Sequence, residues 1–334
     1  MSSISDFVIY SGVLFGYKGN DAAVFIPTTV NEIGGGVFDH CSNLVSVVIG
    51  NNVKSIGHCA FSDCTNLNSI IISDSVADIG EYAFSGCCNL KRIQIPEKIN
   101  RIETGVFNKC TTLTSILIPN RVVYIGEFAF SDCTNLQSVV IPENVTFLDK
   151  FAFYNCKGLT NLTIGGGLTN VCEHAFSGCN SLLNITIPDG VVTIGDSVFS
   201  DCSSLKNVTI GNGVQTISDS AFSGCSSLKN VAIGNSVQTI GGSAFDGCSG
   251  LTNVVIPNSV VVIKSFAFRG CGSLESIVIP HSLTNIGVAA FSGCDNLTSV
   301  YYRGTEEEWN QISVGSFNEH LNNATIHYNY VPEE

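Results

Sequence analysis

FDHCSNLVSVVIGNNVKSIGHCA, residues 38–60, is followed directly by a second copy of the same 23-residue pattern, FSDCTNLNSIIISDSVADIGEYA, residues 61–83. Each copy begins with a phenylalanine, and a cysteine and then a leucine follow at intervals of three residues. The phenylalanine recurs without a slip at Phe38, Phe61, Phe84, Phe107, Phe130, Phe153, Phe176, Phe199, Phe222, Phe245, Phe268 and Phe291. A fixed period of this length is typical of a solenoid, in which each repeat is one coil stacked on the last.

Within one coil, the apolar residues alternate along a short stretch and then return at wider spacing. Val47 and Ile49 flank Val48, a period-2 pattern that predicts a short strand with one face inward. Val53 and Ile56 form a second inward pair, and the Ala-Phe segment that follows predicts a short turn or 3₁₀ stretch. The fold class is therefore an α/β-type but β-dominated repeat solenoid, leucine-rich-repeat-like and right-handed, with about twelve coils, one parallel sheet and capped ends.

Both ends of the chain depart from the repeat, as a solenoid with covered ends requires. The pattern predicts three parts: an N-terminal cap with a first partial repeat (1–37), twelve leucine-rich repeats (38–302) and a C-terminal cap (303–334). The N-terminal cap reads as strands at Phe7–Tyr10, Val13–Tyr17 and Ala23–Ile26. In the C-terminal cap, Thr305 and Glu308 predict a capping box that opens a short helix carrying Trp309, and a strand is expected over 324–330.

Composition excludes several classes of partner. Hydrophobic residues make up 44% of the chain and charged residues 13%, which is not the composition of a disordered protein. The net charge of −13 argues against nucleic acid and against anionic membrane surfaces, and no apolar run is long enough for membrane insertion. The first six residues do not resemble a secretory signal peptide, which leaves a cytoplasmic location and a trimmed chain both open.

Twelve of the fifteen cysteines share one repeat position, so their side chains are expected to form a ladder along the stack. Neighbouring members of such a ladder point the same way, whereas a disulfide needs converging Cβ atoms and zinc needs four converging ligands. We therefore expect buried free thiols that fill the core. Cys59, Cys88 and Cys172 lie off the ladder and are the better candidates for reactive thiols.

The repeat unit resembles a known family. Residues 251–271, LTNVVIPNSVVVIKSFAFRGC, match the pattern Leu-x-x-Val-x-Ile-Pro-x-x-Val-x-x-Ile-Gly-x-x-Ala-Phe of the BspA-like leucine-rich repeats nearly throughout. The terminal segments also look like the caps of bacterial members. The resemblance implies a curved solenoid, usually displayed at the cell surface and associated with adhesion to host or matrix proteins. It implies no shared catalytic residues.

The sequence offers no constellation for catalysis. Among the outward positions of the predicted strands the only acid is Glu275, and one carboxylate cannot supply both the acid and the base of a glycosidase. The six histidines occupy unrelated repeat positions, and motifs for nucleophilic, phosphate-binding or metalloprotease sites are missing. We expect no enzyme, no cofactor and no metal. Rows of Ser, Asn and Thr on the strand face are interpreted as a solvated polar ladder rather than a dedicated site.

One region breaks the monotony of the repeats. Six of the fifteen basic residues lie between 91 and 121, and bulky aromatic residues follow at positions that elsewhere hold Ser, Gly, Thr or Asp. Residues 23 apart become neighbours in the stack, so Phe128 should lie beside Phe151 and Tyr124 beside Phe147. Aromatic residues and arginine are enriched at interface centres. The candidate partner-binding residues are Lys91, Arg92, Gln94, Arg101, Tyr124, Phe128, Phe147 and Phe151.

The function that the sequence favours is non-enzymatic protein binding and adhesion, at a bacterial surface as the resemblance implies, with a host or matrix protein as the partner. A cytoplasmic scaffold or regulatory binding module is the alternative. A carbohydrate-binding or carbohydrate-cleaving solenoid comes third, because it would need carboxylates clustered with aromatics on the strand face. For the aromatic region itself, the competing interpretation is a packed outer layer with scattered solvated charges.

Overall fold

The computed structural model describes residues 3–331 and divides the chain into two compact units, Met1–Gly167 and Leu168–Glu334. Each unit is a stack of coils, and together they make about fourteen turns rather than the twelve predicted. The difference arises because both caps add a turn. Ala23 pairs with Ser46 at the N-terminal end, and Ser299 pairs with Thr325 at the C-terminal end.

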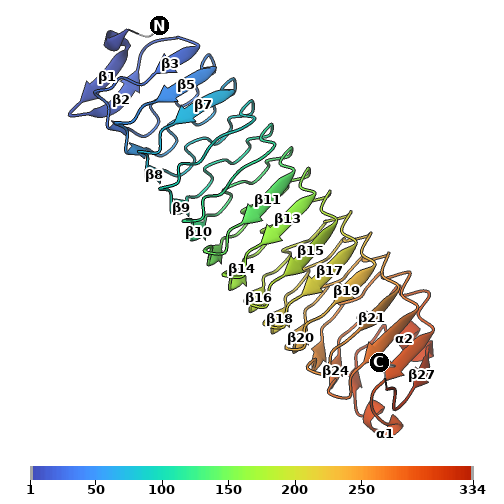
Figure 1. Ribbon diagram of the computed structural model, residues 1–334. Helices are drawn as coiled ribbons and strands as arrows, with labels where there is room; N and C mark the ends of the chain where they lie inside the picture. The colour runs from blue at the N-terminus through green and yellow to red at the C-terminus, as the bar shows by residue number, and fades with distance from the viewer. Residues whose placement is uncertain (1–2, 332–334) are drawn as a thin grey trace. The chain divides into compact units, whose positions relative to one another are not determined.

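The first sheet consists of short parallel strands that pair with their equivalents 23 residues away, as the period predicts. In unit 1 its strands are β3 (Ala23–Phe25), β5 (Ser46–Ile49), β7 (Ser69–Ile72), β11 (Ser138–Ile141) and β13 (Asn161–Ile164). In unit 2 they are β15 (Asn184–Ile187), β17 (Asn207–Ile210), β19 (Asn230–Ala232), β21 (Asn253–Val255), β23 (Ser276–Ile279), β25 (Ser299–Tyr302) and β27 (Thr325–His327). Figure 1 shows β3, β5 and β7 side by side. Residues 91–95 and 116–118 take the equivalent place in their coils without regular strand structure.

A second parallel sheet, which the sequence did not predict, forms at the second inward pair of each coil. In unit 1 its strands are β4 (Glu32–Ile33), β6 (Ser55–Ile56), β8 (Asp78–Ile79), β9 (Arg101–Ile102), β10 (Tyr124–Ile125) and β12 (Phe147–Leu148). In unit 2 they are β14 (Asn170–Val171), β16 (Thr193–Ile194), β18 (Thr216–Ile217), β20 (Thr239–Ile240), β22 (Val262–Ile263), β24 (Asn285–Ile286) and β26 (Ser313–Val314). Two residues are too few to show an alternating pattern, so periodicity could not reveal these strands.

Phenylalanine rings form the centre of each unit. Phe38 and Phe61 stack with their centroids 5.0 Å apart and their planes 5° from parallel, and the later pairs repeat this geometry. The rings are almost completely buried. The segment that carries them is a series of turns, as expected, and its backbone bonds to the next coil: the Phe61 N–H donates to the Ala83 carbonyl at 2.8 Å. Each ring thus packs on two neighbours, and no coil could bury its apolar side chains alone.

The predicted inward positions are buried with few exceptions. Ile116, Val231 and Ile233 are only half-buried, in contrast to what the repeat pattern predicts. Ile116 lies where the first sheet lacks a regular strand, and Val231 and Ile233 lie where that sheet is interrupted between β19 and β21. These three side chains are therefore partly exposed at places where the first sheet is irregular.

The N-terminal cap contains a 3₁₀ turn, η1 (Ile4–Asp6), and two antiparallel strands, β1 (Phe7–Tyr10) and β2 (Val13–Tyr17). Tyr17 extends the aromatic column, because its ring centroid lies 5.3 Å from that of Phe38. The two strands match the predicted ranges. The third, β3, ends one residue earlier than expected, although the Ile26 N–H still donates to the Val48 carbonyl at 3.0 Å.

The C-terminal cap begins with α1 (Glu306–Trp309), which the predicted capping box opens: the Glu308 N–H donates to the Thr305 hydroxyl. Trp309 packs edge-on against the buried Tyr302, with ring centroids 5.2 Å apart. A second helix, α2 (Glu319–Asn323), was not predicted, and the closing strand β27 is shorter than expected. Among residues 3–331, no helix combines the length and the apolar character that a bilayer crossing requires.

Candidate functional site

Three candidate residues form a continuous stack on the outer face of the second sheet in unit 1. β9, β10 and β12 pair in parallel, which places Arg101 beside Tyr124 and Tyr124 beside Phe147. The Arg101 guanidinium carbon lies 4.0 Å from the centroid of the Tyr124 ring. The Tyr124 and Phe147 rings stack at 5.8 Å with 19° between their planes. We call these three residues the Arg101 stack.

Carboxylates on either side hold the Arg101 stack in place. The Arg101 Nε donates to Glu103 Oε1 at 2.8 Å, and the Tyr124 hydroxyl donates to Asp149 Oδ2 at 2.8 Å. Burial, together with the hydrogen bond to Asp149, raises the pKa of Tyr124 to about 12. The stack still faces solvent, since the Arg101 side chain is 48% and Phe147 39% exposed. It is thus a fixed aromatic surface with one cation, Arg101, and two neighbouring carboxylates, Glu103 and Asp149.

The other two aromatic candidates stack separately. Phe128 and Phe151 have ring centroids 5.0 Å apart with planes 11° from parallel, and Tyr154 meets Phe151 edge-on at 5.7 Å. Phe128 and Phe151 have φ angles of 55° and 56°, a left-handed conformation that bulky residues rarely adopt. The predicted neighbours Phe128–Phe151 and Tyr124–Phe147 are therefore both confirmed, but as two clusters rather than one.

The remaining candidates lie elsewhere on the coil. Lys91, Arg92 and Gln94 are exposed in the segment 91–95, at the place of the first sheet rather than the second. Within residues 3–331, no side-chain hydrogen bond or ion pair joins any of them to the Arg101 stack. Because the candidate residues are close in the sequence, we expected one basic and aromatic patch. In the structure, the coil places these residues on different faces.

The polar residues of the first sheet satisfy one another, which supports their interpretation as a ladder. Asn207 Nδ2 donates to Asn184 Oδ1 at 2.6 Å, and Asn230 Nδ2 donates to Asn207 Oδ1 at 2.7 Å. Thr186 and Thr209 are paired in register on the same strands. Such amide rows stabilise neighbouring strands without any ligand.

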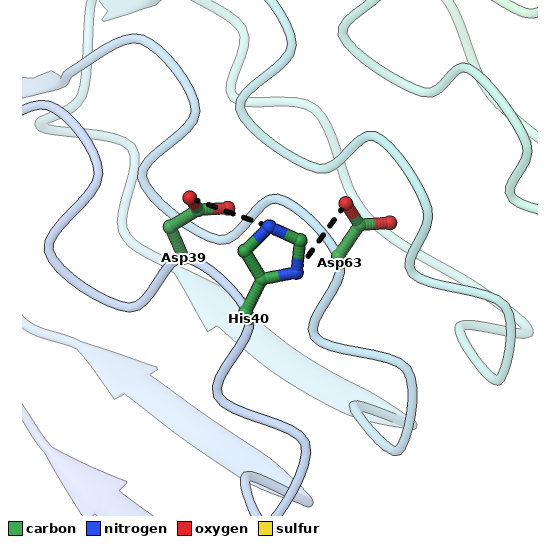
Figure 2. Close-up of side chains that lie close together, drawn as sticks. All are labelled: Asp39, His40 and Asp63. Carbon is green, nitrogen blue, oxygen red and sulfur yellow. Dashed lines mark ion pairs between the residues drawn. The ribbon is translucent and has the colours of Figure 1, made fainter.

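Sequence reasoning missed one group of titratable residues. His40 lies between Asp39 and Asp63, with Nε2 3.7 Å from the first carboxylate and Nδ1 3.6 Å from the second (Figure 2). Their possible ligand atoms lie within 4.8 Å of one another. Asp63 follows His40 by one repeat, so the 23-residue spacing was the available signal. The His40 side chain is 73% exposed and no buried group orients the three, so we interpret them as surface ion pairs.

The cysteine ladder is inert, with a hydrogen-bond pattern that the sequence did not show. All fifteen cysteines are free thiols, and eleven of them are buried, all on the ladder. The Cys64 Sγ donates to the Phe38 carbonyl of the preceding coil at 3.0 Å, and later members repeat the contact. Burial raises the pKa of the Cys64 and Cys294 thiols to about 12, which suppresses the reactive thiolate. Cys41, at the first coil, is the one ladder member that is only half-buried.

The coil architecture agrees with comparisons to known proteins. The family described as the BspA type leucine rich repeat region matches residues 13–122, 101–229 and 215–331, in six copies. The chain belongs to this family. BspA-type repeats are leucine-rich repeats, and proteins of this kind typically bind other proteins and are generally non-enzymatic. Comparison with curated protein sequences finds no match.

Several solved structures share the fold of this chain. A leucine-rich repeat protein from Bacteroides ovatus is 28% identical, with a TM-score of 0.62, and the match covers 98% of this chain and 97% of that one. A leucine-rich repeat protein from Eubacterium ventriosum is 25% identical, with a TM-score of 0.56, over 85% and 88% of the two chains. The pneumococcal vaccine antigen PcpA is 18% identical with a TM-score of 0.58, over 97% and 96%, a likeness of fold alone.

Proposed function

We propose that this BspA-type protein is a non-enzymatic adhesin that binds a host or matrix protein at a bacterial surface, with the Arg101 stack at the centre of the binding surface. The observation that carries the proposal is the Arg101–Tyr124–Phe147 column, exposed to solvent and held by two carboxylates. Surface display is what the family resemblance implies, and the preference for a protein partner follows from the family's typical activity.

The chemistry of the stack suits a protein interface. Arginine and tyrosine are among the residues most enriched at the positions that dominate binding energy, especially where neighbours exclude water. Glu103 and Asp149 fix both side chains before a partner arrives, so little side-chain entropy is lost on binding. Phe128, Phe151 and Tyr154 form a second, separate aromatic cluster in the same coils. Phe128 and Phe151 occupy a left-handed position that recurs in every coil, where a bulky side chain costs more stability than the serine or glycine of other coils, which favours a role for these rings outside folding.

A direct test compares two triple variants in binding to a panel of purified extracellular-matrix and serum proteins by surface plasmon resonance. Replacing Arg101, Tyr124 and Phe147 with alanine should weaken binding at least about thirtyfold, because loss of one central anchor costs about 2 kcal/mol. The matched control replaces Asn207, Thr209 and Asn230 with alanine on the first sheet. Should the control lose binding while the stack variant binds normally, or should no panel protein bind, the proposal fails.

A second candidate, a cytoplasmic scaffold, is favoured by one observation. Fifteen cysteines without a disulfide are more usual in a reducing compartment than outside the cell. The discriminating experiment is fractionation of the source cells with an antibody against this chain. Detection on intact cells supports the adhesin, and recovery only from the cytosol supports the scaffold.

A further inference from the structure

The first sheet of unit 2 is interrupted between two consecutive coils. β19 pairs with β17 and β21 pairs with β23, but no backbone hydrogen bond among residues 3–331 joins β19 to β21. The asparagine ladder also ends there, at Asn230. Directly beyond, the coils rejoin: the Ser259 hydroxyl donates to the Val237 carbonyl at 2.7 Å and the Val261 N–H to the Gln238 carbonyl at 2.9 Å. The opening is therefore local.

A cavity of about 640 Å³ occupies this opening, within the range of small-molecule sites. Its apolar lining includes Val231, Val255 and Pro257, and its polar lining includes Asn235, Asn258 and Arg303. Val231 is one of the half-buried residues that the repeat pattern places inward. The cavity thus offers apolar side chains that the fold leaves uncovered, beside a single cation.

Arg303 stands at a position where the two preceding coils have the turn formers Pro257 and Pro280. Its side chain reaches back over two coils, and Nη1 donates to Asn258 Oδ1 at 2.8 Å. Its Nε is buried and has no hydrogen-bond partner. Among the described residues no carboxylate pairs with this guanidinium, although the chain has a net charge of −13.

A buried N–H of a charged group without an acceptor is costly, and native proteins rarely leave one. The side-chain oxygen of Asn258 accepts from Arg303, which leaves the Asn258 amide nitrogen available as a donor to a ligand. Two donor groups on an apolar cavity match a carboxylate, which accepts hydrogen bonds from arginine in fixed geometry. A site whose only cation is Arg303, in an acidic chain, suits a ligand with a single negative charge better than it suits a phosphate.

We propose that this cavity binds a carboxylic acid with an apolar body, with Arg303 and Asn258 holding the carboxylate. The site lies in unit 2 and is independent of the Arg101 stack, which lies in unit 1. The same chemistry occurs in a free medium-chain fatty acid and in the C-terminal residue of a peptide with an apolar side chain. Two experimental arms separate these sources.

The test is isothermal titration calorimetry of the full chain with paired probes. One arm compares octanoate with octanol, and the other compares N-acetyl-Ala-Val-Leu as the free acid with its amide. In at least one arm the acid should bind about ten- to hundredfold more tightly than its neutral partner, as expected for a charge-assisted contact. The arm with the larger preference identifies the source of the ligand.

Two variants assign the site. Arg303→Gln should abolish the preference for the acid, whereas Lys264→Gln, which removes one exposed positive charge elsewhere in unit 2, should leave it unchanged. Ala232→Phe, at an exposed strand position that lines the cavity, should block both probes while Arg303 is intact. Equal affinity for acid and neutral probes, no binding of either acid at millimolar concentration, or an Arg303→Gln variant that binds like the parent would overturn the proposal.

Discussion

Two backbone positions in each coil adopt the left-handed conformation, two residues before and two residues after the ladder phenylalanine. The later position holds mostly Asp, Asn or Gly, which tolerate this conformation, but the earlier one holds Tyr82, Phe128, Phe151 and Phe266 as well as Ser and Gly. At Gly105, a Cβ atom would lie 2.2 Å from Cε1 of Tyr82, one coil earlier. Glycine at position 105 therefore permits the left-handed backbone and also leaves room for the Tyr82 ring of the preceding coil.

Gly105→Ala should destabilise the protein more than Gly247→Ala. Both positions have positive φ, at 62° and 72°, but a Cβ at Gly247 meets no atom closer than 3.8 Å. We expect about 1 kcal/mol for Gly247→Ala, from the backbone alone, and about 1–3 kcal/mol more for Gly105→Ala. Chemical denaturation measures both. Adding Tyr82→Ser to Gly105→Ala should reduce the loss of stability to that of Gly247→Ala. If the additional loss is unchanged, the Tyr82 ring is not its cause.

The Tyr124–Asp149 hydrogen bond makes a prediction about pH. The folded-state pKa of Tyr124 is raised from 10.0 to about 12, so its contribution to stability is complete below pH 10 and is lost as the pH rises towards 12. The absorbance difference between the parent and Tyr124→Phe should show a phenol that ionises well above pH 10. Asp149→Asn should bring that ionisation back towards pH 10, because it removes both the acceptor charge and its repulsion of the phenolate.

At the scale of the element, the coil is held by rows of identical contacts, and the thiol row is the easiest to count. Four cysteines are half-buried, namely Cys41, Cys59, Cys88 and Cys172. The native protein should therefore label rapidly at four positions or fewer, and the unfolded, unreduced protein at all fifteen. Rapid native labelling of Cys202 or its neighbours in the ladder, identified by mass spectrometry, would contradict the buried row.

The elements also show how far the sequence could predict the structure. Phe38 and its eleven equivalents fixed the period, and with it the coil, the first sheet and the neighbours of Phe128 and Tyr124. The second sheet was missed because strands such as Tyr124–Ile125 are too short for a periodic signal. The distribution of Arg92 and Arg101 over separate faces depends on turn geometry, which the spacing alone does not encode. Arg303 was missed because its contacts span two coils.

For the whole molecule, stability depends on how the array ends. In regular coils the phenylalanine N–H donates to a carbonyl of the next coil, as Phe268 does to Ala290. The last one, Phe291, donates instead to the side-chain oxygen of Asn318 at 3.0 Å, and Asn318 Nδ2 donates to the Gly287 and Gly315 carbonyls. The buried Asn318 amide thus replaces the missing coil.

Asn318→Ala should lower the free energy of unfolding by about 1–3 kcal/mol, because it leaves a buried N–H and two carbonyls unsatisfied. Hydrogen exchange should accelerate most at Phe291 and the adjoining turn. Asn296→Ala is the matched control, since the Asn296 amide donates to the Gly272 carbonyl at an exposed position. Equal losses for the two variants would mean that Asn318 does not close the array.

The equivalence of successive coils has a consequence for the gene. Misaligned recombination that deletes or duplicates one whole repeat leaves every new neighbour with the same phenylalanine, cysteine and leucine contacts, so the encoded chain still folds. A deletion or duplication of a repeat between Arg101 and Phe147 disrupts the Arg101 stack, because its three residues come from three particular coils in a fixed order. The number of repeats can therefore differ between strains, whereas the order of Arg101, Tyr124 and Phe147 is retained only under selection for binding.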